Sequence, residues 1–263
     1  MKTCISVVVD RKYQNYVPFF VYFIQRSYPD YFVKIFLTEK INNKYLKAFS
    51  LVKTDKIEYL ENSFSGFPKA EHQQLKCLRW IIPESFFQDF DYVYMGDVDM
   101  LICKESVSLV DQHINNMNLE KLPYSNIVRP NSERMSGLHF MSNEYFKEIE
   151  ESRNYFEKKI KSGKRYKNEN FLYQLIKHSE LPFPSGLFRP HHGIHLGLWR
   201  KGLKALSADW YCPPMNPKKS EHLSYYNFYL DQEKTKTFQD LSKMISLPEL
   251  IRMKKYFNQL SNT

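Results

Sequence analysis

The stretch that decides the fold reads Asp91-Tyr92-Val93-Tyr94-Met95-Gly96-Asp97-Val98-Asp99-Met100-Leu101. Its apolar first half predicts a buried β-strand, which ends in two carboxylates two positions apart. In an extended chain this spacing places Asp97 and Asp99 on the same side. Open α/β sheets bind ligands at the carboxyl ends of their strands, and carboxylate oxygens suit Mg²⁺ or Mn²⁺. The strand end therefore predicts a divalent metal site, although an Asp-x-Asp tripeptide elsewhere usually marks a solvated turn.

Outward from this strand, strand-like and helix-like apolar segments alternate along the chain. This alternation predicts an α/β domain with a largely parallel sheet. Strands are predicted at Ile5–Val9, Phe32–Leu37, Ile57–Leu60, Tyr92–Met95, Gly137–Met141 and Gly193–Leu198. Helices are predicted at Tyr16–Ser27, Lys44–Leu51, His72–Ile82, Asn143–Lys161, Asn168–His178 and Leu247–Leu260.

The composition excludes several classes of protein. The 263 residues are 43% hydrophobic and 25% charged, close to the average of globular proteins, and no apolar run approaches the roughly 18 residues of a membrane span. Only 8 glycines occur, and neither a G-x-G-x-x-G nor a G-x-x-x-x-G-K-[ST] string is present. A Rossmann dinucleotide site or a P-loop is therefore not expected. The formal net charge of +9 predicts an anionic partner.

The cysteines indicate a reducing compartment. Cys4, Cys77, Cys103 and Cys212 are scattered and lack the spacing that structural zinc needs, so we expect them to be buried small hydrophobes. The first residues run directly into a predicted strand, without a separate apolar leader. We therefore expect an intracellular, cytoplasmic protein.

A second group of polar residues lies late in the chain, in Arg189-Pro190-His191-His192-Gly193-Ile194-His195-Leu196-Gly197-Leu198-Trp199-Arg200-Lys201. Three histidines within five positions are hard to explain by packing alone. If the segment is extended, His191 and His195 share one face, opposite the apolar side chains. An imidazole from this group can complete the coordination of a cation held by the two aspartates, and the following Arg200 and Lys201 can hold phosphate.

A third, weaker signal follows the first predicted strand, at Asp10-Arg11-Lys12-Tyr13. The Asp10 carboxylate can accept a hydrogen bond from a base or a ribose, and the Tyr13 ring can stack on a base. Asp after a strand is also the ordinary turn residue, so this segment decides nothing alone.

Together these residues resemble family 8 glycosyltransferases, which include bacterial lipooligosaccharide galactosyltransferases and glycogenin. The resemblance rests on the Val9–Tyr13 segment, on Leu78–Glu84, on the Asp97-Val98-Asp99 motif and on the late His/Gly/basic segment, and it extends from about Cys4 to Trp210. It implies a GT-A-type, Rossmann-like mixed sheet flanked by helices. We expect a catalytic domain over residues 1–215 and a C-terminal helical extension over residues 216–263.

The resemblance also implies a role for particular residues. Asp97 and Asp99 would bind Mn²⁺ (or Mg²⁺) with one late histidine, for which strand parity favours His195 over His192 and His191. The nucleotide sugar would be bound by Asp10, Tyr13, Arg79, Asp97, Val98, Ser136, Gly137, Arg200 and Lys201, with the first two at the base, Arg79 at the diphosphate and the Ser136-Gly137 turn at the sugar. Asn168 and Glu169 would lie beneath the anomeric face as catalytic residues.

The implied activity is the transfer of a hexose from a nucleotide-diphosphate sugar, expected to be a UDP-sugar, to a glycan or a lipid-linked saccharide, with retention at the anomeric carbon. Glu169 is then the candidate nucleophile, base or sugar anchor. The late segment departs from the family pattern His-x-x-Gly-x-x-Lys-Pro-Trp: it has one residue fewer between His195 and Gly197 and lacks the Pro-Trp. This departure leaves open which histidine binds the metal and whether Arg200 or Lys201 takes the phosphate.

Two other functions compete with this interpretation. A metal-dependent nuclease or another nucleic-acid-binding protein would use the basic stretch Lys158–Lys167, but a solvated helix end explains that stretch equally well, and we expect no nucleic acid. A non-catalytic sugar-binding module could keep the same fold. The apolar and basic residues of Leu247–Leu260 have helical spacing, and they suggest a peripheral contact with the inner face of a membrane or packing on the domain itself.

Overall fold

The computed structural model describes residues 1–67, 72–201 and 219–260, and its centre is a six-stranded mixed sheet in the order β3-β2-β1-β4-β7-β6. The parallel strands are β1 (Thr3–Val9), β2 (Phe32–Leu37), β3 (Ile57–Leu60) and β4 (Tyr92–Met95). β7 (His139–Ser142) pairs antiparallel with both β4 and β6 (Tyr124–Ser125). The predicted α/β fold with a mixed sheet is therefore confirmed.

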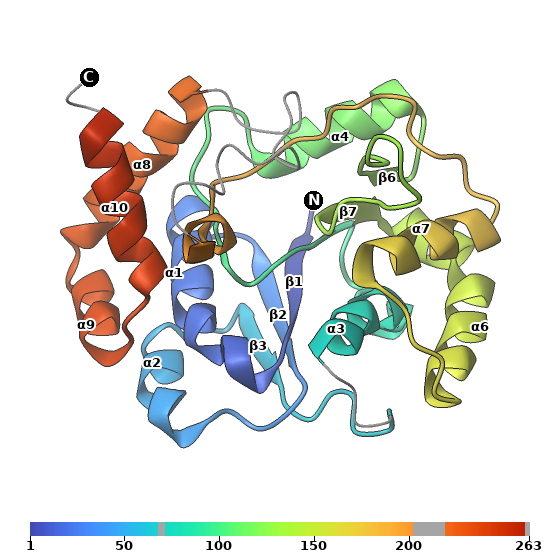
Figure 1. Cartoon of the computed structure of the whole chain (residues 1–263), viewed down its shortest axis with the longest axis horizontal. Helices are drawn as coiled ribbons and strands as arrows, with labels where there is room; N and C mark the ends of the chain where they lie inside the picture. The colour runs from blue at the N-terminus through green and yellow to red at the C-terminus, as the bar shows by residue number, and fades with distance from the viewer. Residues whose placement is uncertain (68–71, 202–218, 261–263) are drawn as a thin grey trace.

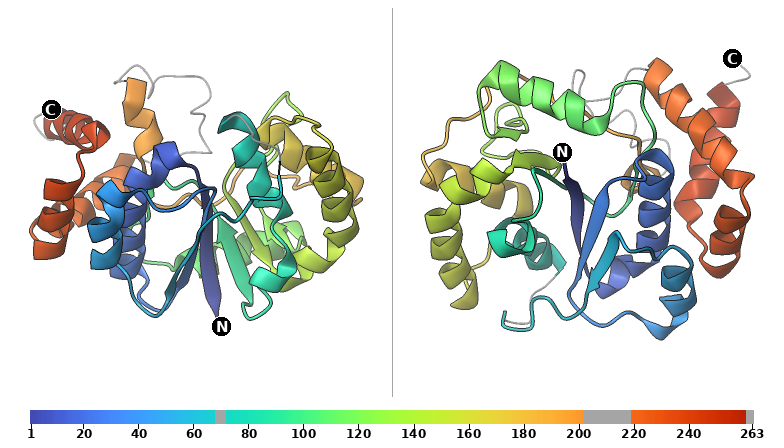
Figure 2. Two further views of the ribbon diagram at one scale, coloured as in Figure 1. Left: turned by 90° about the horizontal axis from the view of Figure 1, so that it is seen from below. Right: turned by 180° about the vertical axis from the view of Figure 1, so that it is seen from behind.

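Helices cover both faces of the sheet (Figures 1 and 2). On one side lie α1 (Val17–Ser27), α2 (Leu46–Leu51), α8 (Lys219–Glu233), α9 (Lys236–Met244) and α10 (Pro248–Leu260). On the other side lie α3 (His72–Leu75), α5 (Asn143–Glu148), α6 (Glu150–Lys161) and α7 (Asn168–His178). Each layer buries its own apolar cluster against the sheet, as expected where strands are apolar on both faces.

The central pair of strands sets the place where a ligand can bind. β1 and β4 are parallel neighbours, with Thr3 opposite Tyr92 and Ser6 opposite Met95. After β1 the chain continues through α1 to β2, which lies on one side of the pair. After β4 the next strand of the sheet beside the pair is β7, which lies on the other side. The carboxyl ends of β1 and β4 therefore form a crevice of the kind that binds ligands in open α/β sheets.

Three predicted elements differ in detail. Only the first turn of the predicted helix His72–Ile82 is α-helical, and the chain continues as the 3₁₀ helix η3 (Lys76–Ile81), whose last residues are fixed by tertiary contacts of Arg79 and Trp80. The predicted helix Asn143–Lys161 is two helices, because the chain turns at the buried Ile149. The predicted strand Gly193–Leu198 is reduced to β8 (Ile194–His195), which is followed by the 3₁₀ helix η5 (Leu196–Lys201).

The C-terminal helices that the sequence predicts are present, and their apolar side chains face the domain. Along α10, Leu250, Met253 and Phe257 are buried, and the rings of Tyr256 and Phe257 pack on Trp199 of η5. Most of the apolar side chains that suggested a membrane contact are thus buried against the domain, although Ile251 is exposed. Among the described residues, no helix combines the length and apolarity needed to span a bilayer.

The cysteines behave as expected where the structure describes them. Cys4, Cys77 and Cys103 are buried, and Cys212 lies outside the described residues. Burial raises the pKa of the Cys4 and Cys77 thiols to about 12, so neither is a reactive thiolate at neutral pH.

Candidate active site

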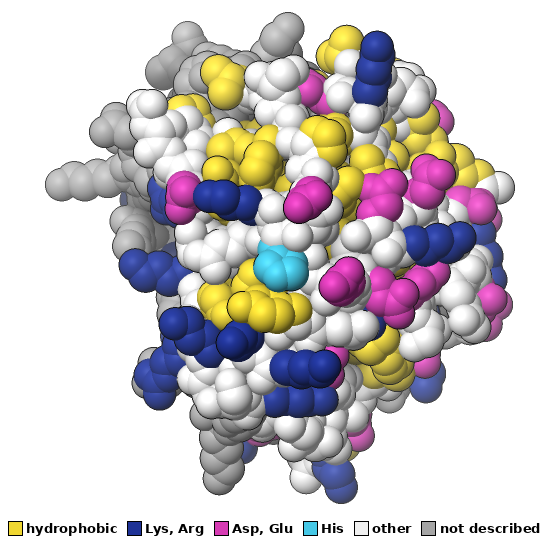
Figure 3. All heavy atoms as spheres, turned by 90° about the vertical axis from the view of Figure 1, so that its right-hand side faces the viewer, with side chains coloured by type: hydrophobic (Ala, Val, Ile, Leu, Met, Phe, Trp, Pro, Cys, Tyr) yellow, Lys and Arg dark blue, Asp and Glu magenta, His cyan; other side chains and the backbone are white. Residues whose placement is uncertain are grey.

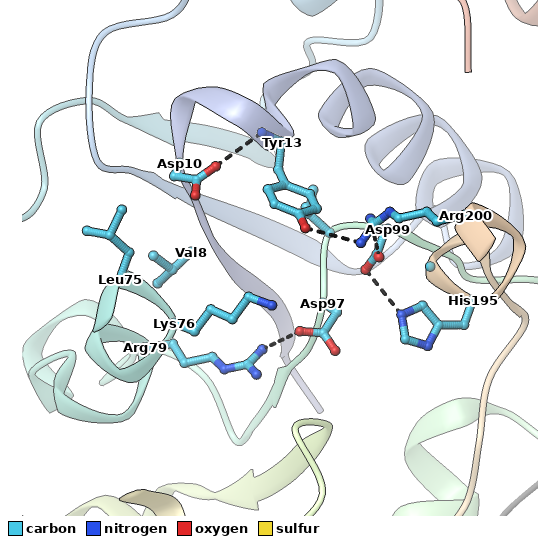
Figure 4. A pocket seen from close by; sticks show the side chains of 12 residues that line it. Val8, Asp10, Tyr13, Leu75, Lys76, Arg79, Asp97, Asp99, His195 and Arg200 are labelled. Carbon is cyan, nitrogen blue, oxygen red and sulfur yellow. Dashed lines mark hydrogen bonds and ion pairs between the residues drawn. The ribbon is translucent and has the colours of Figure 1, made fainter. Parts of the chain in front are cut away.

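A cavity of about 230 Å³ opens at the carboxyl ends of β1 and β4 (Figure 4). Its walls come from four segments far apart in the sequence: the end of β1, the helical turn of α3 and η3, the loop after β4, and η5. The lining residues are Val8, Asp10, Tyr13, Leu75, Lys76, Arg79, Asp97, Val98, Asp99, His195, Gly197 and Arg200. The structure therefore brings together eight of the predicted site residues, which are Asp10, Tyr13, Arg79, Asp97, Val98, Asp99, His195 and Arg200.

Asp97, Asp99 and His195 form a compact group on one wall of this cavity. Each offers one ligand atom, and the three atoms lie within 4.8 Å of one another. A short antiparallel ribbon creates this proximity, because β5 (Met100–Leu101) pairs with β8 and sets Met100 opposite His195. Asp99 precedes β5 directly, and its Oδ1 lies 3.3 Å from His195 Nε2.

The donor set fits a divalent cation. Two carboxylates and one imidazole can bind Mn²⁺ or Mg²⁺ together with waters or phosphate oxygens. Gly197 adjoins the group, since a Cβ at this position would lie 2.7 Å from Asp99 Oδ2 and 2.9 Å from His195 Nε2. A side chain there would crowd the ligand atoms. No second group of three such ligands occurs in the described parts of the chain.

Asp99 is held ionised by its neighbours. Arg200 Nη2 donates to Asp99 Oδ2 at 2.5 Å, while His195 contacts the other oxygen. Burial favours protonation of Asp99, but His195 and Arg200 outweigh it and hold the pKa of this carboxyl well below its usual range. For His195, burial alone would lower the pKa, but the carboxylate of Asp99 outweighs burial and raises the pKa above the ordinary value. Asp99 is thus anionic across the physiological pH range.

Arg79 reaches the same wall from η3. Its Nη1 donates to Gly96 O and to Asp97 Oδ1, both at 2.8 Å, whereas its buried Nε and Nη2 have no hydrogen-bond partner among the described residues. A Cβ on Gly137 would lie 2.9 Å from Nη2, so this position admits only glycine without displacing the guanidinium. Arg79 therefore presents a buried cation with unused donors beside Asp97, which is an arrangement suited to an anionic ligand.

Asp10 and Tyr13 line the opposite side of the cavity. Asp10 Oδ1 accepts from the backbone N–H groups of Lys12 and Tyr13, at 3.0 and 3.2 Å, and so caps the 3₁₀ helix η1 (Arg11–Tyr16). The Arg200 guanidinium lies over the Tyr13 ring at 4.8 Å, and its Nη1 donates to the Tyr13 hydroxyl at 3.1 Å. This side of the cavity combines a carboxylate, an aromatic ring and a cation.

The remaining predicted residues do not all reach the cavity. Asn168 Oδ1 accepts from Trp80 Nε1 at 2.8 Å, and its Nδ2 would lie 3.7 Å from a Cβ on Gly137, so Asn168 adjoins the wall that carries Arg79. Glu169 does not line the cavity, because its carboxylate pairs with Arg129 at 2.5 Å and with Arg134 at 3.8 Å.

Ser136 and two of the three late histidines do not line the cavity. Ser136 is buried, and its Oγ accepts from Arg189 Nε at 3.0 Å. His192 is fully buried, and its Nδ1 contacts the Glu105 carboxylate at 2.9 Å. His191 is absent from both the cavity lining and the group of ligands. The side chain of Lys201 lies outside the described part of the structure.

One cation of the cavity was not predicted from the sequence. Lys76 lies three residues before Arg79 in η3, and in a 3₁₀ helix such residues point the same way. The α-helix expected over this segment would have turned the two side chains farther apart. The basic pair with a spacing of three is the signal that could have identified Lys76.

Comparisons with known proteins give a likeness in fold only. No protein-family model matches the chain, and no curated protein matches it. Among solved structures, the galactosyltransferase LgtC in complex with donor and acceptor sugar analogs is 16% identical, with 65% of this chain and 70% of that chain covered and a TM-score of 0.43.

Two other solved structures match more of the chain. The glycosyltransferase GlyE in Streptococcus pneumoniae TIGR4 is 9% identical, with 98% of this chain and 64% of that chain covered and a TM-score of 0.48. The bifunctional glycosyltransferase WbbM is 14% identical, with 94% and 52% covered and a TM-score of 0.47. All three of these proteins are glycosyltransferases.

Proposed function

We propose that the protein is a metal-dependent glycosyltransferase that moves a hexose from a nucleotide-diphosphate sugar, expected to be a UDP-sugar, to a saccharide or glycolipid acceptor. The observation that carries the proposal is the group of Asp97, Asp99 and His195 on the wall of a cavity that also holds three cations, Lys76, Arg79 and Arg200. A diphosphate needs both a divalent cation and side-chain cations when it leaves water.

Within this proposal, Asp97, Asp99 and His195 hold Mn²⁺ or Mg²⁺. A bound cation of this kind stabilises the negative charge that develops on the leaving diphosphate. Arg79 assists from the same wall, because its unused N–H donors lie beside Asp97. Lys76 and Arg200 add positive charge to the lining of the cavity, so departure of the nucleoside diphosphate needs no further acid.

Asp10 and Tyr13 are assigned to the nucleotide, as the resemblance implies. They lie on the wall opposite Arg79, at the end of β1. The sugar would then face Gly137 and Asn168, because these residues adjoin Arg79 and Asp97 on the other side. Domain 1–215 would carry all of these residues, and the helices within 216–263 would support η5 from behind.

Retention at the anomeric carbon stays part of the proposal, with front-face attack favoured over double displacement. The Glu169 carboxylate is bound by Arg129 and Arg134, so it would have to break two ion pairs to act as a nucleophile. Asn168 is closer to the Gly137 wall but is not nucleophilic. Glu169 is therefore assigned a positioning role on the loop that precedes Gly137, where its backbone oxygen also accepts from Met135 N–H at 3.1 Å.

The test is a panel of UDP- and GDP-sugars assayed with Mn²⁺ for donor hydrolysis and for thermal stabilisation of the protein. We expect one base to stabilise the protein in the presence of Mn²⁺ and to lose this effect with EDTA. A panel in which no donor is bound or hydrolysed would contradict the proposal and favour the sugar-binding module. Retention on DNA, together with a silent donor panel, would favour the nucleic-acid alternative.

A further inference from the structure

A second, larger hollow lies over α6 and α7, away from the candidate active site, and we call it the basic groove. It encloses about 970 Å³. Its cationic lining side chains are Arg134, Lys164, Arg165, Lys167 and Lys177, all exposed, against one carboxylate, Glu133. In Figure 3, which views this side of the molecule, Lys and Arg gather toward the lower left and Asp and Glu lie mainly toward the right.

The local structure explains why these cations converge. The chain leaves α6 through Gly163, whose φ of +91° reverses its direction, and the next residues run back across the helix layer into α7. This return segment carries Lys164, Arg165 and Lys167, and the last turn of α7 adds Lys177. The run of basic residues therefore forms one wall of a hollow. A solvated helix end, the other interpretation of this run, would not enclose such a hollow.

The first turn of α7 lies between the groove and the candidate active site. Asn168 adjoins Gly137 and Trp80 on the cavity side. Its neighbours Lys167 and Asn170 line the groove. Glu169, between them, pairs with Arg134 of the groove. A ligand lying in the groove would thus end beside the wall that we assign to the donor sugar.

We propose, on the basis of the function proposed above, that the basic groove binds the acceptor and that this acceptor is an anionic saccharide, bearing phosphate or carboxylate groups. The cations supply the charge complementarity. The polar side chains of Ser132, Asn170 and Gln174 also line the groove, and amide and hydroxyl groups of this kind hydrogen-bond sugar hydroxyls.

The same groove fits nucleic acid or a bilayer less well. Its aromatic rings are already engaged, because Tyr155 stacks on His178 at 4.5 Å with the Lys159 ammonium 5.2 Å from the ring centre, and Tyr166 packs against Phe156 and Phe171. Binding of single-stranded nucleic acid relies on free aromatic faces for base stacking. The groove is moreover hollowed, whereas a bilayer presents a flat surface.

The experiment compares a groove variant with a matched control. Lys164→Glu/Lys177→Glu changes two exposed cations of the groove, and Lys47→Glu/Lys53→Glu changes two exposed cations on and after α2, at the other side of the sheet. Both variants shift the net charge equally. Calorimetric titration at fixed salt uses hexagalacturonate, its methyl-esterified neutral counterpart, and a maltohexaose carrying a terminal 6-phosphate.

We expect the wild-type protein and the α2 control to bind at least one anionic saccharide about tenfold or more tightly than the neutral one, and the groove variant to lose about tenfold in affinity. The two anionic probes distinguish carboxylate from phosphate. Equal binding of the groove variant and the control would overturn the inference, as would stronger binding of a single-stranded oligonucleotide or of phosphatidylglycerol vesicles by the wild-type protein.

Donor binding separates this inference from the proposed function. Stabilisation by Mn²⁺ and a nucleoside diphosphate should be the same in the wild-type protein and in the groove variant. If that stabilisation is present while the anionic saccharides bind without preference, only the acceptor inference fails. If it is missing from the wild-type protein, the proposed function fails.

Discussion

Two carboxylate–histidine pairs, only three residues apart on the histidine side, have opposite surroundings. His195 and Asp99 line a cavity together with a second aspartate and cations. His192 and Glu105 are sealed inside the protein, where the hydroxyl of Tyr225 donates to Glu105 at 2.7 Å and the ring of His113 lies 5.0 Å from that of His192. Here we call the first pair the open pair and the second the sealed pair.

The difference shows that residue type does not decide the role of a histidine. In the open pair, Asp99 raises the pKa of His195, and a third ligand is in reach. In the sealed pair there is no third ligand group among the described residues, and burial lowers the pKa of the neighbouring His113 well below its ordinary value. The open pair can bind a cation, whereas the sealed pair joins the segment just before α4 (Leu109–Glu120), the loop before β8 and α8.

The largest expected effect concerns the carboxylates of the open site. Asp97→Ala or Asp99→Ala should lower metal-dependent transfer by about a thousandfold or more, which corresponds to about 4 kcal/mol of transition-state stabilisation. Transfer is measured with the donor identified in the panel, and circular dichroism checks that the variants fold. Full activity of either variant in the presence of a chelator would contradict the metal site.

Replacing each of the two histidines by alanine tests the comparison directly. His192→Ala should lower the free energy of unfolding by about 2–4 kcal/mol, because it leaves the Glu105 carboxylate buried without one partner. His195→Ala should change the stability by less than about 1 kcal/mol but weaken Mn²⁺ binding by about tenfold or more. Urea unfolding and Mn²⁺ titration measure the two quantities, and the reverse pattern would show that His192 is the ligand.

Acidification should weaken the sealed region. Burial, with smaller contributions from His192, Arg189 and His139, lowers the pKa of His113 in the folded state below the ordinary value of 6.5. The unfolded chain therefore binds the proton first, and stability that is present above pH 6.5 is lost as the pH falls, by up to about 1.4 kcal/mol per pH unit.

Urea unfolding between pH 7 and pH 4.5 measures this loss. His113→Gln cannot take up a proton and should flatten the dependence of stability on pH relative to the wild-type protein. An unchanged slope in the variant would assign the loss to other groups, such as His139, whose pKa burial lowers to about 3.

The smallest expected effect is on stability, when one tyrosine hydroxyl is removed from each of the two regions. Tyr225→Phe removes the hydrogen bond to Glu105 and should cost about 1 kcal/mol. Tyr13→Phe removes the contact with Arg200 on a half-buried ring and should cost less than about 0.5 kcal/mol. Thermal unfolding of both variants gives the comparison. Equal losses would mean that the open site is as important for stability as the sealed one.

Much of the fold was predictable because its signals are local. The strands that end at Val9 and Met95 are apolar runs followed by carboxylates, so both the strands and the positions of Asp10, Asp97 and Asp99 follow from short-range patterns. α4 was not predicted, because its inward face carries the polar residues His113 and Asn116, both of which hydrogen-bond Ser125, and so lacks a clear apolar period. Within the expected helical extension, the bounds of α8 were not predicted for a similar reason, since its buried face is made largely of tyrosines.

In the candidate site, too, some features follow from local sequence and others only from the tertiary structure. The sequence by itself determined that a metal site at the end of β4 is plausible chemistry, since two carboxylates at a spacing of two need only a local extended chain. It also narrowed the third ligand to a few late histidines. The tertiary structure then places one of them beside the carboxylates, because the pairing of β5 with β8 sets Met100 opposite His195 and so brings this histidine to Asp99.

For the positive charge too, the sequence determined one part and the tertiary structure the other. The net charge of +9 follows from composition, but its distribution depends on contacts that no local pattern encodes. The 3₁₀ winding of η3 aligned Lys76 with Arg79, and the reversal at Gly163 folded a run of lysines into the basic groove. Long-range packing fixes such geometry, because it brings together residues whose separation in the sequence gives no sign that they meet.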